Sequence, residues 1–266
     1  MDIMRPYISE GRMNKMETVL RERCLDVLFL YENPVNPSNV YACLRTMDAF
    51  GVQNCCIVDG GYSRVLANSG DKTGGEVRKK KSRKSKHSAM GSDKWLTVER
   101  VNTKGRGMGG VVERLREEGY RIYSSSLEGG VDIRSFSFSH PSVCPPNPPS
   151  PSSPPPTPSK ICIVFGNEES GVSQSLKSLS DGLFYLPMSG FAESYNLSVA
   201  TSLTLAYLQS MGVIRRTEGW ERERREIMCK WMIGCFPKKG MGEMILEKEG
   251  IEVLRAGTGG AGGGGV

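Results

Sequence analysis

The chain has 266 residues, which is enough for one domain with a full hydrophobic core or for one domain with long insertions. Its formal net charge of +6 suits a polyanionic partner without requiring one, and no apolar run approaches the ~18 residues of a membrane-spanning helix. The eight cysteines include no CxxC pair and occur with only two histidines, which argues against a zinc site and favours buried, reduced thiols in an intracellular protein. We therefore expect no metal and a cytoplasmic location, with an organelle left open.

The first part of the chain has the pattern of a strand–helix–strand unit. The run DVLFLY at 26–31 is typical of a buried strand, and the apolar residues before it have helical spacing. The predicted elements, in chain order, are a helix over 15–23, a strand over 26–31, a helix that Ser38 or Asn39 caps and Gly51 ends, and a strand over 54–59. Their length predicts a right-handed crossover between two parallel strands.

Two segments of biased composition interrupt the rest of the chain. Residues 60–93 are rich in Gly, Ser and Lys and contain the basic run 78–87. Residues 139–159 hold so many prolines that neither helix nor sheet can form. We interpret both as flexible insertions into one domain over 1–234, followed by an extension over 235–266 with a flexible Gly-rich end.

The remaining elements continue the alternation of strands and helices. They are predicted strands over 94–101, 120–123, 161–165 and 182–186, and predicted helices over 109–118, 172–179, 196–209 and 218–231. This alternation predicts an α/β domain with a mostly parallel sheet and helices on both faces. Ligands of such sheets bind beyond the carboxyl ends of the strands.

Polar residues gather after the first predicted strand and after the one over 161–165. Asn39 and Arg45 lie on the helix after the first, where a planar guanidinium suits phosphate recognition, although a helix cap and a surface arginine would give the same pair. The segment FGNEESG at 165–171 has two glycines that would let the backbone approach a ligand, or it is an ordinary strand-to-helix turn. It lacks GxGxxG and a P-loop lysine, so neither a Rossmann dinucleotide site nor a P-loop is supported.

A third polar cluster runs from Leu186 to Ser198. Here a strand ends, a Gly-containing loop follows, and Ser194 with Asn196 opens the predicted buried helix. Free N–H groups at a helix start form a natural site for a polar ligand, and simple N-capping is the alternative explanation.

Together, the three clusters resemble the three motifs of the SpoU family of RNA 2′-O-methyltransferases. NxxxxxR followed by TxDAxGV matches residues 39–52, GxExxG matches 166–171, and IPMxGxxxSLNxSxA matches 186–200 with Tyr195 in place of the usual Leu. Order and spacing agree over roughly residues 15–234, apart from the two insertions. Gly91-Ser-Asp-Lys-Trp95 and the last predicted helix are most similar to the tRNA guanosine-2′-O-methyltransferase (TrmH-like) branch, which modifies the guanosine at position 18 of the D loop.

The resemblance implies a homodimeric enzyme that uses S-adenosyl-L-methionine to methylate a ribose in tRNA, on a SPOUT-type α/β fold with a C-terminal trefoil knot. Arg45 would stabilise the developing oxyanion and grip a phosphate, since an arginine stays protonated and is a poor general base. Asn39 and Glu168 would orient it, while Ser194 and Asn196 would shape the cofactor and ribose pocket, which completes the set of catalytic candidates. The cofactor-binding candidates are Phe165, Gly166, Asn167, Leu186, Met188, Gly190, Ser194, Asn196 and Leu197. The RNA-binding candidates are Lys79, Lys80, Lys81, Arg83, Lys84, Arg215 and Arg216.

Three alternatives stay open at this point. The first is the same chemistry on ribosomal RNA, although the length of the chain and its last helix favour tRNA. The second is a non-catalytic RNA-binding protein on the same fold, whose signature would be the loss of Arg45, Glu168 or Asn196, and all three are present. The third is that the basic run is a localisation signal or a solvated segment with no role in RNA binding.

Overall fold

The computed structural model describes residues 3–59, 91–103, 107–138, 160–236 and 240–248. The basic run, the Pro-rich insertion and the Gly-rich end all lie outside these residues. The chain divides into two compact units, one over residues 22–219 and one that joins residues 1–21 to residues 220–266. The expected domain over 1–234 with its insertions stays a proposal.

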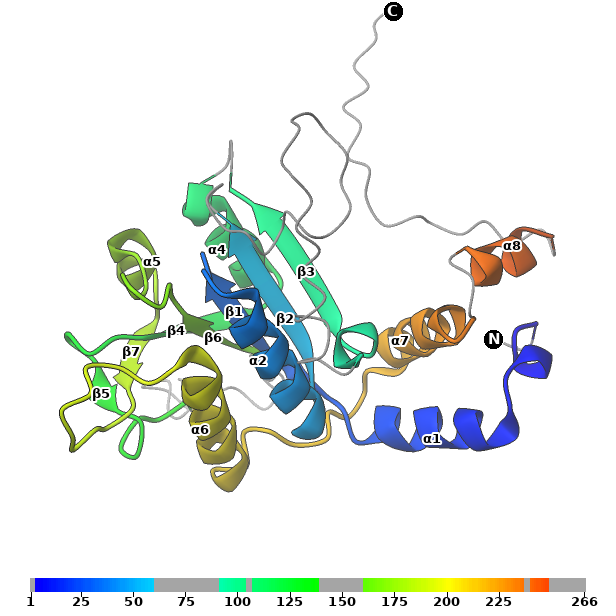
Figure 1. Ribbon diagram of the computed structural model, residues 1–266, viewed down its shortest axis with the longest axis horizontal. Helices are drawn as coiled ribbons and strands as arrows, with labels where there is room; N and C mark the ends of the chain where they lie inside the picture. The colour runs from blue at the N-terminus through cyan, green and yellow to red at the C-terminus, as the bar shows by residue number, and fades with distance from the viewer. Residues whose placement is uncertain (1–2, 60–90, 104–106, 139–159, 237–239, 249–266) are drawn as a thin grey trace, which may run out of the picture. The chain divides into compact units, whose positions relative to one another are not determined.

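The larger unit is built on a parallel seven-stranded sheet (Figure 1). The strand order is β3-β2-β1-β6-β4-β7-β5, and every neighbouring pair is parallel, which confirms the predicted α/β class. Its elements are β1 (Cys24–Glu32), α2 (Pro37–Ala49), β2 (Val52–Asp59), η3 (Ser92–Lys94), β3 (Thr97–Asn102), α4 (Gly107–Glu117), β4 (Tyr120–Ser125), β5 (Val131–Asp132), β6 (Lys160–Phe165), α5 (Gln174–Ser178), β7 (Gly182–Tyr185) and α6 (Leu197–Ser210).

Side chains of the central strands alternate between two hydrophobic layers. In β1, Phe29 and Tyr31 belong to the layer that holds the buried residues of α2 and α6. Leu28 and Leu30 belong to the opposite layer, with the buried residues of α4 and α5. Both faces of the sheet are therefore covered by helices, which explains why its strands read as nearly continuous apolar runs.

The sheet has a topological switch between β1 and β6. From β1 the chain crosses through α2 to β2, whereas from β6 it crosses through α5 to β7 in the opposite direction along the sheet. Because α2 and α5 cover opposite faces, the segments that follow β1 and β6 separate at the carboxyl edge of the sheet. Ligands of open α/β sheets bind at such points, and the first two polar clusters of the sequence both lie there.

The helix after β1 begins slightly earlier than predicted. Its N-cap is Asn36, not Ser38 or Asn39: the Asn36 side chain accepts a hydrogen bond from the Ser38 N–H at 2.9 Å. Pro37 occupies the first turn, where a missing N–H costs nothing. Asn39 therefore does not cap the helix, and its side-chain amide is available for other hydrogen bonds. Gly51, with φ at 77°, follows the helix as predicted.

The smaller unit consists of short helices. They are η1 (Arg5–Tyr7), α1 (Glu10–Arg21), α7 (Glu221–Gly234) and α8 (Met241–Lys248). α7 contacts both α1 and α8, and the Arg224 guanidinium donates to the carbonyl of Leu20. α1 begins five residues before the predicted helix over 15–23, and α8 was not predicted. Among the described residues, none of the helices has the length and apolar character that crossing a membrane requires.

Candidate active site

Glu168 joins the second polar cluster to the segment that precedes α2. Its carboxylate accepts hydrogen bonds from the backbone N–H of Val35 at 2.8 Å and of Asn36 at 3.3 Å. The side-chain amide of Asn39 is a third donor, at 3.1 Å. Hydrogen bonds to an ionised acceptor are stronger than neutral ones. Three of them fix the loop after β6 to the start of α2, so Glu168 acts in this structure as a positioning group.

Asn39 links Glu168 to the third polar cluster. The amide nitrogen of Asn196 donates to the side-chain oxygen of Asn39 at 3.2 Å. Asn196 is also the N-cap of α6, because its side-chain oxygen accepts from the Ser198 N–H at 2.9 Å. The chain of hydrogen bonds from Glu168 through Asn39 to Asn196 therefore connects all three motifs of the sequence.

The loop after β6 is a closed turn with no room for a side chain at its first position. Asn167 and Gly171 exchange two backbone hydrogen bonds, at 3.0 and 2.9 Å. The Asn167 side chain completes the turn by accepting from the Glu169 N–H and donating to the carbonyl of Asn33, both at 2.8 Å. A Cβ on Gly166 would lie 2.0 Å from the carbonyl carbon of Gly171, so only glycine fits there.

A buried polar chain holds α2 and α6 in place beneath the site. Tyr31 on β1 shares a hydrogen bond with Thr201 on α6 at 3.2 Å, and the Thr201 hydroxyl donates to the sulfur of Cys43 on α2 at 3.4 Å. Burial raises the pKa of the Cys43 thiol to about 11 and the pKa of Tyr31 well above its usual value. Both groups therefore stay neutral at pH 7, and their role is to align the helices that carry Asn39 and Asn196.

The third-motif loop, residues 187–195, is closed by a hydroxyl that the family pattern lacks. Tyr195 donates from its phenol to the carbonyl of Pro187 at 3.0 Å. Within residues 187–195 the backbone makes no turn or cap hydrogen bonds to other backbone groups, and a Cβ on Gly190 would meet nothing within 4 Å. Backbone donors and acceptors that lack partners in the chain pair with water or with a ligand. The adenine and ribose of the expected cofactor carry groups that could pair with them.

The other cofactor-binding candidates contribute mainly through their backbone. Phe165, Leu186 and Leu197 belong to the hydrophobic layer beneath the loops, so their side chains serve the core. Met188 is half-buried, and Ser194 is exposed. The loop after β4 was missed by the sequence analysis: the Ser126 N–H donates to the carbonyl of Phe184 at 2.8 Å, so this loop flanks the end of β7.

Arg45 lies apart from the network of Glu168, Asn39 and Asn196. It is exposed on α2 and makes no hydrogen bond or ion pair within the described part of the chain. Six residues of helix turn it to a different side from Asn39. Arg215 and Arg216, after α6, are also exposed, while the lysines and the arginine of the basic run fall outside the described residues.

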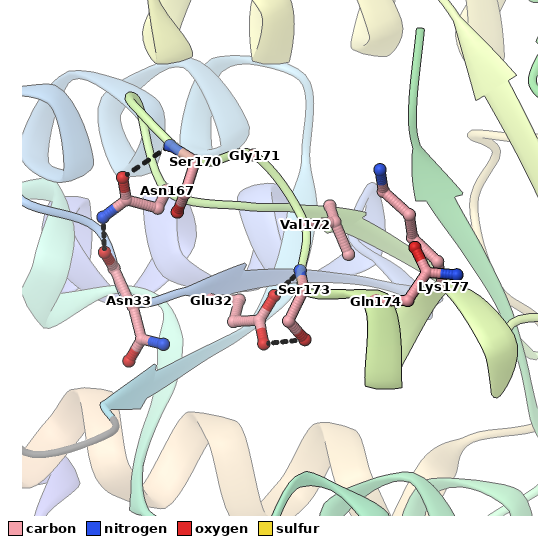
Figure 2. A pocket seen from close by; sticks show the side chains of 9 residues that line it. All are labelled: Glu32, Asn33, Asn167, Ser170, Gly171, Val172, Ser173, Gln174 and Lys177. Carbon is pink, nitrogen blue, oxygen red and sulfur yellow. Dashed lines mark hydrogen bonds between the residues drawn. The ribbon is translucent and has the colours of Figure 1, made fainter. Parts of the chain in front are cut away.

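A polar pocket of about 390 Å³ lies between the segments that follow β1 and β6 (Figure 2). Its central group is Glu32, which is buried and accepts from the Ser173 N–H at 2.8 Å and the Ser173 hydroxyl at 2.6 Å. Sequence reasoning singled out neither residue, because they are 141 positions apart. In the described residues, no cluster of three or more His, Cys, Asp or Glu side chains could hold a metal ion.

The sequence profile described as the SpoU rRNA Methylase family matches residues 26–206. A tRNA (guanosine(18)-2′-O)-methyltransferase of Thermus thermophilus is 30% identical over 200 residues, which cover 74% of this chain and 81% of that protein.

Solved structures of other proteins share the fold. The Aquifex aeolicus TrmH/SpoU tRNA modifying enzyme has a TM-score of 0.62 at 24% identity, and the match covers 86% of this chain and 98% of that one. A SpoU methyltransferase from Streptomyces viridochromogenes, solved with the cofactor AdoMet, has a TM-score of 0.51 at 23% identity and covers 73% of this chain and 59% of that one.

Proposed function

The chain belongs to the SpoU rRNA methylase family, and from this membership we propose that it transfers the methyl group of S-adenosyl-L-methionine to a ribose 2′-OH of tRNA. The name of the Thermus thermophilus relative points to the guanosine at position 18 as the target. The observation that carries the proposal is the hydrogen-bonded chain of Glu168, Asn39 and Asn196, which joins the first motif to the second and the third, 129 and 157 residues away in sequence.

The cofactor site of the proposal comprises three backbone segments at the carboxyl edge of the sheet. These are residues 164–168, 186–190 and 194–198, of which the second has no turn or cap hydrogen bonds between backbone groups and has open space beside Gly190. When bound, the cofactor supplies an electrophilic methyl group on a sulfonium. The chain itself then has to align the ribose hydroxyl with that methyl group and to stabilise the negative charge that develops on the oxygen.

Arg45 is the residue that we assign to stabilising the negative charge on the ribose oxygen. Its guanidinium is exposed and has no partner in the described residues, so it is available to an RNA phosphate or to the reacting oxygen. The network of Glu168 and Asn39 fixes the start of the helix on which Arg45 lies. Turnover should therefore depend on Arg45 directly and on the network indirectly.

We also propose the trefoil knot of the family for residues after β7. The path of the chain supports it: β7 lies beyond β4, yet α6 packs against α2. The segment between them therefore runs back past the positions of β4 and β6 in the sheet. A cytoplasmic location stays a prediction from the sequence.

A homodimer is a further part of the proposal. Large apolar side chains are exposed around the network, namely Val35, Phe191, Tyr195 and Val199. Soluble monomers rarely expose large contiguous apolar patches, so exposed apolar side chains that gather in one region indicate a protein interface.

The test is methyl transfer from labelled S-adenosyl-L-methionine to unmodified tRNA and, in parallel, to unmodified ribosomal RNA. The modified nucleotide is then mapped by its resistance to alkaline cleavage, because a 2′-O-methyl group blocks that reaction. We expect one modified guanosine in tRNA. Transfer to ribosomal RNA alone would favour the second substrate, and absence of transfer to either RNA would overturn the proposal.

A further inference from the structure

The pocket beneath the loop after β6 has a polar lining that the proposed chemistry does not use. Figure 2 shows Asn33 and Asn167 at one side, Glu32 and Ser173 in the middle, and Gln174 with Lys177 on α5 at the other side. Its volume of about 390 Å³ lies in the range of ligand sites. Of the cofactor-binding candidates only Asn167 lines it, so the pocket is separate from the third-motif loop.

Glu32 gives the pocket a fixed hydrogen-bond acceptor. The residue is 4% exposed, and each carboxylate oxygen accepts one hydrogen bond from Ser173. A carboxylate has about four lone-pair positions, so one acceptor position remains on each oxygen. A ligand that presents two adjacent N–H groups can occupy both positions.

Lys177 gives the pocket a positive end. It is half-buried on α5 and makes no hydrogen bond or ion pair within the described residues. A simple anion would be repelled by the carboxylate of Glu32 in the middle of the pocket, and a simple cation would be repelled by the ammonium group of Lys177 at its end. A nucleotide satisfies both, because its phosphate is anionic while its base can be a donor. Among the common bases, guanine has two adjacent donors on one edge, at N1 and N2.

We propose that this pocket binds one unpaired guanosine nucleotide of the RNA, with the base donating to Glu32 and the phosphate paired with Lys177. The assignment rests on the proposed function, since it takes RNA as the substrate. Sequence-specific recognition of RNA acts on unstacked bases through their hydrogen-bonding edges, which is the contact described here. The same loop would then serve two tasks, since Asn167 lines the pocket and its neighbour Glu168 anchors α2.

The probes for the test are guanosine 5′-monophosphate, adenosine 5′-monophosphate and inorganic phosphate. Each is titrated into the full chain by amide NMR, with S-adenosyl-L-homocysteine present at saturation to block the cofactor site. We expect the guanosine nucleotide to shift the amides of residues 170–177 and to bind at least about tenfold more tightly than the adenosine nucleotide. Inorganic phosphate alone should shift only the end that holds Lys177.

Two variants and two controls sharpen the result. Glu32→Gln should remove the preference for guanosine, and Lys177→Ala should weaken both nucleotides about two- to fivefold without changing the preference. Glu169→Gln and Lys94→Ala change exposed charges outside the pocket and should leave nucleotide binding as in the wild type. Glu32→Gln also alters the hydrogen bonds with Ser173 and could therefore impair folding. Lys177→Ala alters neither of these hydrogen bonds, so its effect on nucleotide binding does not depend on such a defect.

Several outcomes would overturn the inference. They are equal binding of the two nucleotides, no shifts in residues 170–177, and shifts of residues 174–177 on α5 by S-adenosyl-L-homocysteine alone, which would make the pocket part of the cofactor site. Methyl transfer to RNA is measured on the same samples. Transfer without nucleotide binding in the pocket would refute this inference alone, whereas nucleotide binding without any transfer would refute the proposed function and support the pocket.

Discussion

Replacing Gly166 with alanine should open the loop after β6. The added Cβ would lie 2.0 Å from the carbonyl carbon of Gly171 and 2.1 Å from the nitrogen of Val172, and both atoms belong to the backbone. Relief requires loss of the two hydrogen bonds between Asn167 and Gly171, at about 1 kcal/mol each, in addition to about 1–3 kcal/mol for overpacking. The expected loss is about 3–5 kcal/mol of unfolding free energy, a large share of the ~5–15 kcal/mol that stabilises a typical domain.

Urea unfolding and calorimetric binding of S-adenosyl-L-methionine measure the two consequences. Gly190→Ala is the matched control, because it alters another motif glycine around which no atom lies within 4 Å of an added Cβ. It should change stability by no more than about 0.5 kcal/mol. Gly166→Ala should in addition lose cofactor affinity, since the opened loop displaces residues 164–168, one of the three proposed cofactor segments. A wild-type unfolding midpoint for Gly166→Ala, or an equal loss in both variants, would refute the steric argument.

Four further predictions follow from the same contacts. Arg45→Ala should keep its stability and cofactor affinity but slow single-turnover methyl transfer about 100- to 1,000-fold, and Arg45→Lys should rescue it poorly because a point charge cannot replace a planar fork. Glu168→Gln should cost about 1–2 kcal/mol in urea unfolding, because an NH2 group would replace one of the two accepting oxygens and face one or two of the three donors. Neutralising the basic residues within 79–84 should weaken tRNA binding and its salt dependence in filter-binding assays, but the methylated nucleotide should not change. Burial raises the pKa of Cys24 and of Cys56 from the ordinary thiol value of 9.0 to about 12. The stability that these two neutral thiols contribute is therefore complete below pH 9 and should decline between pH 9 and pH 12, which thermal unfolding at a series of pH values would measure.

Much of the fold could be predicted because its strands are buried on both faces. β1 and β6 pack between two helical layers, so each appears in the sequence as an apolar run, and the helices between strands keep their own periodicity. β5 has only two residues and carries no pattern, and α8 follows a stretch without strong helix signals. The N-cap at Asn36 was missed because Asn36, Ser38 and Asn39 are all good capping residues, and only the backbone conformation distinguishes them.

In the candidate site, only the residues that belong to the three sequence motifs could be predicted. Asn39, Glu168 and Asn196 were named from motif order, and the structure brings them into one hydrogen-bonded chain. The contact between Glu32 and Ser173 was missed, because a carboxylate at the end of a strand gives no sign of a partner 141 residues away. A serine at a helix N-cap is similarly common, so only the three-dimensional arrangement reveals the pocket that the two residues form.

The central claim is that the chain methylates a ribose hydroxyl, and one substitution in the RNA tests it most directly. A tRNA with guanosine at position 18 is compared with the same tRNA that carries 2′-deoxyguanosine there, by transfer of labelled methyl groups and by binding. We predict that the deoxy substrate binds with nearly unchanged affinity and accepts no methyl group at that nucleotide, because the attacking oxygen is missing. Undiminished transfer to the deoxy nucleotide would contradict the account, since the methyl group would then have gone to the base.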